Sequence, residues 1–79
     1  MARKLQNISI REFKSFLSFH GLKHIRTSGG HEIWSRKDLL RPVVFQTHID
    51  PIPIFIIKNN IRNMNLTVKD LRVYLNNKD

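Results

Sequence analysis

The chain has 79 residues, of which 41% are hydrophobic, and it contains no cysteine. This length allows a single domain with one core of modest size, and the lack of cysteine excludes disulfide bonds and thiolate chemistry. Fourteen Lys and Arg residues against six Asp and Glu residues give a formal net charge of +8 at pH 7. A polyanion, above all a nucleic acid, is therefore the expected partner.

Nothing in the sequence resembles a targeting or membrane segment. The longest apolar stretch, residues 52–57, is too short to cross a bilayer. The basic residues Arg3 and Lys4 are followed by a mixed run in which Arg11, Glu12 and Lys14 interrupt the apolar residues, unlike a signal peptide. We therefore expect a cytoplasmic protein that does not interact with membranes.

The first element is expected to be a helix that begins at Ile10, because residues 9–12, Ser-Ile-Arg-Glu, have the form of a capping box. Gly21 stands where a left-handed cap would end this helix. His20 lies near the end of the helix, where we expect it to be structural. Phe19 lies off the apolar face, which consists of Phe13, Phe16, Leu17 and His20.

Three strands are expected next, over residues 22–27, 31–36 and 42–46. The first strand alternates in a way that predicts half burial, with Lys23, Ile25 and Thr27 on one side and Leu22, His24 and Arg26 on the other. Ser28-Gly29-Gly30 forms the hairpin turn that leads into the second strand. Trp34 in the second strand is expected to fill the core.

Two helices are expected to complete the chain. Pro53 is well placed at the first turn of one helix, whose buried face would be Ile54, Ile57 and Ile61, with Lys58 and Arg62 pointing outward. Residues 67–70, Thr-Val-Lys-Asp, give a second, weaker capping signal for a short last helix, whose inward residues would be Val68, Leu71 and Leu75. The sequence thus predicts one α+β domain over residues 1–79, with a three-stranded antiparallel sheet, helices packed on one face and a short extra C-terminal helix.

His31 is the best candidate for a functional side chain. Two consecutive glycines precede it and allow positive φ and close approach of another molecule, and histidine is the side chain whose ordinary pKa lies nearest neutral pH. On the same hairpin, Lys23, Arg26 and Arg36 are candidate phosphate contacts, although strand alternation places Arg36 opposite to His31. The plainer interpretation is an ordinary hairpin turn that ends in a polar edge residue.

No metal or other cofactor is expected. The four histidines, His20, His24, His31 and His48, lack the spacing of metal ligands on one helix, and few carboxylates accompany them.

The order of elements resembles the double-stranded-RNA-binding-domain-like α-β-β-β-α fold. Together with particular motifs, the chain resembles the HicA family of mRNA-interferase toxins over nearly its whole length. These motifs are Gly21, Gly29-Gly30-His31, Glu32-Ile33-Trp34, His48, Ile56-Ile57-Lys58 and Asn65-Leu66-Thr67. The sequence departs from the family in two places, with Gly-Gly-His where Gly-Ser-His is usual and Gln46-Thr47-His48 where Pro-x-His is usual.

The resemblance implies an endoribonuclease that cleaves messenger RNA without a metal and is held inactive by a HicB-type antitoxin that covers its active site. It implies His31 as the catalytic base, which would take the proton from a 2′-hydroxyl of RNA, and Gly30 as the turn residue before it, in contact with RNA. Such cleavage also needs positive charge for the phosphate and an acid for the leaving group, and the sequence identifies no acid. His48 matches a motif position and is an accessory candidate whose role the resemblance leaves open.

Two other interpretations stay open. One is a non-catalytic RNA-binding module on the same fold, in which His31 is only a turn residue. The other is a helix-turn-helix DNA-binding protein made of the last two helices, whose recognition helix would start Val68-Lys69-Asp70 with an acidic residue among the expected DNA contacts. A structure with little strand would favour this last interpretation.

Overall fold

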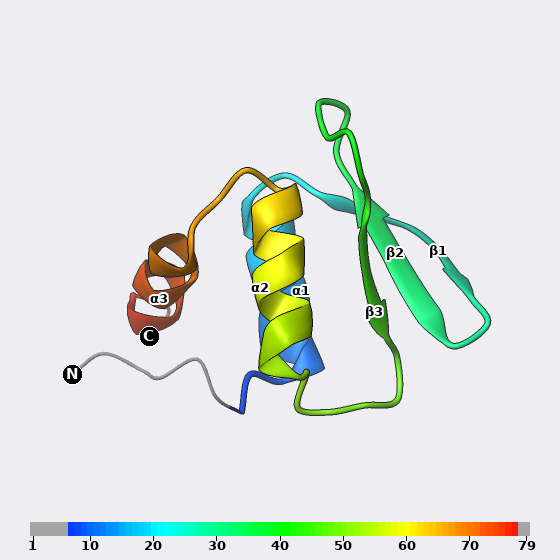
Figure 1. The fold of residues 1–79 in the computed structure, drawn as a ribbon, viewed down its shortest axis with the longest axis horizontal. Coiled ribbons are helices and arrows are strands. Elements are labelled where there is room, and N and C mark those ends of the chain that lie inside the picture. Colours follow the sequence, from blue (N-terminus) through cyan, green and yellow to red (C-terminus); the bar gives the residue numbers. More distant parts are fainter. Residues whose placement is uncertain (1–6, 78–79) are drawn as a thin grey trace.

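A computed structural model describes residues 7–77, and it confirms the predicted α+β architecture. The strands form an antiparallel sheet of order β1-β2-β3, and the helices lie to one side of it (Figure 1). The elements are α1 (Ile10–Phe19), β1 (Lys23–Ser28), β2 (His31–Ser35), β3 (Val43–Gln46), α2 (Ile54–Asn63) and α3 (Val68–Asn76). Within residues 7–77, no helix is both long enough and apolar enough to cross a membrane. The sheet is present, so the low strand content that would favour the helix-turn-helix interpretation is not found in residues 7–77.

The first helix begins where the sequence predicts, with a complete capping box. The backbone N–H of Glu12 donates to Oγ of Ser9 over 3.0 Å, and the backbone N–H of Ser9 donates to Oε1 of Glu12 over 3.2 Å. Thr67 and Asp70 form the same reciprocal pair at the start of α3, over 3.3 Å and 2.7 Å. Each pair satisfies backbone donors that the first turn of a helix cannot pair internally.

One hydrophobic core joins the helices to the sheet. It is built mainly from the inward faces of α1, α2 and α3 and from the side chains of β2 and β3 that point toward them: Phe13, Phe16, Leu17, Trp34, Val43, Phe45, Ile57, Ile61, Leu71 and Leu75. Phe19 is 68% exposed, as predicted. The expectation that Ile54 is buried is wrong, because this first residue of α2 is 39% exposed while Ile52, just before the helix, fills the core at 4% exposure.

The expectation that β1 is half-buried is also wrong, because all six of its residues are exposed. β1 is an outer strand of the sheet, while the core draws its strand residues from β2 and β3. In addition, His24 pairs with Trp34 and Arg26 pairs with Ile33, so that Ile25 is an extra residue in the ladder. Such a bulge reverses the alternation of sides, which places Arg26 on the opposite face from the one that strict alternation predicts.

Asn60 holds α2 alongside the free edge of β3. This role of Asn60 was not predicted from the sequence. Its Nδ2 donates to the carbonyl oxygen of Val44 over 2.9 Å, and the N–H of Val44 points to Oδ1 of Asn60 over 3.4 Å. Asn60 is only 5% exposed, so these bonds satisfy both the buried amide and the backbone of an edge strand. These two bonds hold α2 beside β3.

Candidate active site at the hairpin turn

The Gly29-Gly30 turn presents His31 at the very start of β2. Gly29 and Gly30 have φ of +57° and +81°, and Ser28 pairs with His31 across the turn. Two positive φ angles in a two-residue hairpin loop explain why both positions are glycine. The side chain of His31 is exposed, as a general base must be to meet a substrate.

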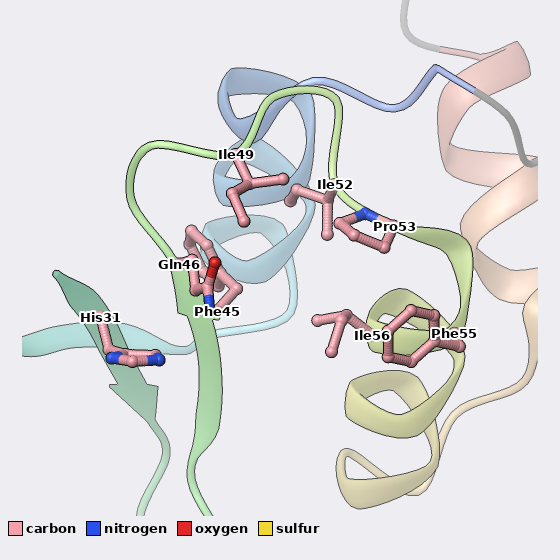
Figure 2. Close-up of a pocket in the computed structure, with 8 residues that line it drawn as sticks. All are labelled: His31, Phe45, Gln46, Ile49, Ile52, Pro53, Phe55 and Ile56. Carbon is pink, nitrogen blue, oxygen red and sulfur yellow. The ribbon is translucent and has the colours of Figure 1, made fainter.

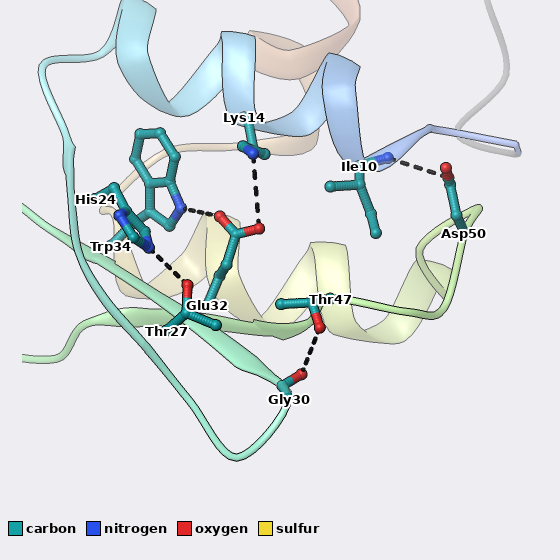
Figure 3. A network of polar contacts seen from close by, with 9 residues as sticks. All are labelled: Ile10, Lys14, His24, Thr27, Gly30, Glu32, Trp34, Thr47 and Asp50. Atoms are coloured by element: carbon teal, nitrogen blue, oxygen red, sulfur yellow. Dashed lines mark hydrogen bonds and ion pairs between the residues drawn. The ribbon is translucent and has the colours of Figure 1, made fainter.

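The segment after β3 is tied to this turn through the carbonyl oxygen of Gly30. That oxygen accepts from the backbone N–H of Thr47 over 2.8 Å and from its Oγ1 over 3.2 Å (Figure 3). The neighbouring residue His48 therefore lies against Gly30: a Cβ atom at Gly30 would be 3.6 Å from Cε1 and 3.8 Å from Nδ1 of His48. The structure thus brings both motif histidines to one turn, His31 directly after Gly30 and His48 across from it.

The register of the hairpin decides which of the predicted phosphate contacts share a face with His31. Directly opposite residues point to the same side of a sheet, and Arg26 pairs with Ile33, which lies on the face of His31. Arg26 is therefore a diagonal neighbour of His31. Lys23 pairs with Ser35, four residues along β2 from His31, which is about 13 Å at roughly 3.3 Å per residue.

Arg36 lies at the other end of the hairpin, where its guanidinium forms bonds with other groups of the chain. Its Nε is 2.6 Å from Oδ1 of Asp38, and its Nη1 donates to the carbonyl oxygen of His20, at the end of α1. The hydrogen bond from Arg36 also lowers the pKa of Asp38. Of the predicted RNA-binding residues, Arg26 and Gly30 are thus near His31, whereas Lys23 and Arg36 are not.

Several polar contacts lie on the helix side of the sheet (Figure 3). Glu32 is 9% exposed, accepts from Nε1 of Trp34 over 2.9 Å and lies 3.6 Å from Nζ of Lys14. His24 Nε2 lies 2.9 Å from Oγ1 of Thr27, and its ring lies beside that of Trp34. Trp34 is 7% exposed, so it belongs to the core, as predicted.

A pocket of about 200 Å³ opens beside His31, between the end of β3, the connection to α2 and the first turn of α2 (Figure 2). Its lining is mostly apolar: Phe45, Ile49, Ile52, Pro53, Phe55 and Ile56, with His31 and Gln46 as the polar members. This pocket was not predicted from the sequence. The unbroken apolar run at residues 54–57 is the signal in the sequence, because one helix face cannot bury four consecutive residues.

Within residues 7–77, no three side chains of His, Cys, Asp or Glu come together in a way that could hold a metal ion. Comparison of the chain with profiles of protein families, with curated proteins and with solved structures gives no match. The residues and geometry around His31 are therefore the basis for assigning a function.

Proposed function

We propose that the protein is a metal-independent endoribonuclease that cleaves messenger RNA, with His31 as the general base. The observation that carries this proposal is the pair of histidines at one turn, with His31 exposed next to Gly30 and His48 in contact range of Gly30. The net charge of +8 supports a polyanionic substrate. The resemblance to HicA toxins, including the glycine and histidine of their motif, points to the same chemistry.

In the proposed reaction, His31 takes the proton of a 2′-hydroxyl, and the 2′-oxygen attacks the adjacent phosphorus. The bond from phosphorus to the 5′-oxygen breaks, and that oxygen must receive a proton as it leaves. His48 is the candidate donor, because histidine is able to hold a proton near neutral pH and this ring lies at the same turn. The products are a 2′,3′-cyclic phosphate and a 5′-hydroxyl.

Arg26 is proposed to stabilise the negative charge that builds on the phosphate. It is exposed, lies on the same face of the hairpin as His31, and forms no ion pair within residues 7–77. A guanidinium can donate two parallel hydrogen bonds to phosphate oxygens.

We further propose that the protein is the toxin of a toxin-antitoxin pair, inhibited by a HicB-type antitoxin that covers the site of His31. This part of the proposal rests on the resemblance to HicA toxins. Expression in a bacterial host should arrest growth, and co-expression of a small protein encoded beside this gene should relieve the arrest. Harmless expression with intact cellular RNA would contradict the toxin assignment.

The nuclease proposal is tested by RNA cleavage with two histidine variants of the same hairpin. His31→Ala should lower the rate about 10²- to 10⁴-fold, the usual contribution of general acid-base catalysis. His24→Ala is the matched control, since His24 is also exposed but pairs with Trp34 and bonds Thr27 on the helix side of the sheet. Equal cleavage by the wild-type protein and His31→Ala would refute the catalytic role, and RNA binding without cleavage would identify a binding module instead.

A further inference from the structure

The pocket beside His31 leaves apolar side chains in contact with solvent. Phe55 is 63% exposed and Ile49 is 39% exposed, and both line the pocket. Exposed aromatic surface around a hollow is unfavourable in water and is typical of a binding site. Figure 2 shows His31 on one side of this hollow and Phe55 on the other.

The shape and chemistry of the lining fit one nucleobase. The volume of about 200 Å³ admits a flat heterocycle, and the aromatic ring of Phe55 offers a face on which a base can stack. Gln46 is exposed at the rim, and its amide carries both a donor and an acceptor for the edge of a base.

Positive charge continues from the pocket along the outward face of α2. Phe55, Lys58 and Arg62 follow one another at intervals of three and four residues, so they share one face of the helix, and all three are exposed. Neither Lys58 nor Arg62 forms an ion pair within residues 7–77. Arg62 also lines a shallow depression together with Arg41, from the connection between β2 and β3.

Carboxylates are nearly absent from this part of the chain. Between residues 39 and 69 the only Asp or Glu is Asp50, and its Oδ1 accepts from the backbone N–H of Ile10 over 3.1 Å. An apolar pocket continued by unpaired cations fits a ligand with flat bases and a phosphate backbone. A partner that only buries apolar surface would leave Lys58 and Arg62 without counter-charges.

We propose that this pocket binds one unstacked nucleobase of single-stranded RNA, stacked on Phe55, while phosphates next along the strand bind Lys58 and Arg62. The proposal rests on the proposed function insofar as RNA is the ligand. It adds that substrate selection lies in the apolar part of the pocket, which His31 borders. A base held there fixes which phosphate reaches His31.

The test measures binding of short single-stranded oligoribonucleotides, each containing one fluorescent 2-aminopurine, to the His31→Ala protein, which keeps the RNA intact. Adding Phe55→Ala should weaken binding about ten-fold and reduce the quenching of the fluorescent base, as is typical for loss of one stacked base. Phe19→Ala, added to the same protein, is the control, because Phe19 is similarly exposed, at 68% against 63% for Phe55, but lies at the end of α1. It should leave binding within two-fold.

A second measurement tests the phosphate contacts. Replacing both Lys58 and Arg62 by Gln should reduce the slope of log affinity against log salt by roughly 1.4, since each phosphate contact on a single strand contributes about 0.7. An unchanged slope would overturn the phosphate part of the proposal.

The outcomes separate this proposal from the nuclease proposal. If RNA is bound and cleaved but Phe55→Ala binds as tightly as its parent, the base pocket is refuted and the nuclease stands. If Phe55→Ala loses binding while the wild-type protein cleaves no RNA, the pocket stands and the nuclease is refuted. If Phe55→Ala keeps its RNA affinity but is no longer inhibited by the antitoxin, the pocket belongs to a protein interface and the proposal is overturned.

Discussion

The two ends of the β1–β2 hairpin have similar polar residues but use them differently. At the end near α1, Arg36 is bound to Asp38 and to the carbonyl oxygen of His20. At the turn, the side chain of His31 is exposed, and the backbone N–H and Oγ1 of Thr47 both donate to the carbonyl oxygen of Gly30. The first end stabilises the fold, whereas the second leaves its side chains available.

The difference shows how a basic residue in this chain can be assigned a role. Arg26 and Arg36 are both arginines of the hairpin, and composition alone treats them alike. Arg36 completes the end of a helix by satisfying a carbonyl that has no partner within the helix. Arg26 is exposed on the face of His31 and forms no such bond with any residue from 7 to 77. Variants at the two ends should accordingly separate stability from RNA chemistry.

The largest expected effect at the turn, after that of His31, comes from His48. If His48 donates the proton to the leaving 5′-oxygen, His48→Ala should lower the cleavage rate about 10²-fold or more. The unfolding transition should stay close to that of the wild-type protein, because His48 is exposed. A cleavage rate of His48→Ala equal to that of the wild-type protein would remove His48 from the mechanism.

The two arginines should show opposite changes. Arg36→Ala leaves the carbonyl oxygen of His20 and the carboxylate of Asp38 without their partner, and should lower the free energy of unfolding by about 1–3 kcal/mol. Arg26→Ala should change it by less than about 0.5 kcal/mol, as is usual for an exposed site, and should weaken RNA binding several-fold. Urea unfolding and RNA titrations measure both. If Arg26→Ala were the destabilised variant, the division between the two ends would be wrong.

The smallest expected effect is a pH dependence of stability from His20, at the structural end. Burial against the ring of Phe16 lowers the pKa of His20 from its ordinary value of 6.5, Asp70 opposes this shift, and Arg36 adds to it. With the lower pKa in the folded state, the unfolded chain binds more protons below pH 6.5, so stability falls as the pH drops from 7 to 5.

His20→Gln should make the melting temperature depend less on pH between pH 7 and 5. The carboxyl groups of Asp38 and Asp70, whose pKa values lie below the ordinary 3.8, contribute stability that is lost only at more acidic pH. A melting temperature of His20→Gln that still falls between pH 7 and 5 as in the wild-type protein would contradict the assignment to His20.

Local signals in the sequence predicted much of the fold. These signals are the capping pairs of α1 and α3, the Gly29-Gly30 turn and the apolar face of α1. Each depends on residues that lie close together in the sequence, and all are confirmed. Alternation failed in β1, because a bulge at Ile25 inserts one residue and because the core reaches only β2 and β3. Neither cause is visible in the strand itself.

Only part of the candidate site could be predicted from the sequence. His31 could be identified because its turn is local, whereas its neighbours come from segments far along the chain. The contact of His48 with Gly30 depends on the bonds of Thr47, and the pocket depends on Asn60 holding α2 beside β3. Register across strands and the placement of α2 are tertiary properties, which no single-sequence spacing encodes.

The most direct test of the central claim is the chemistry of the cleaved ends. The wild-type protein, incubated with single-stranded RNA in the presence of EDTA, should produce fragments ending in 2′,3′-cyclic phosphate and beginning with 5′-hydroxyl, and His31→Ala should produce about 10²- to 10⁴-fold less. Cleavage that stops in EDTA, or fragments that carry a 5′-phosphate, would contradict a mechanism in which His31 activates the 2′-hydroxyl.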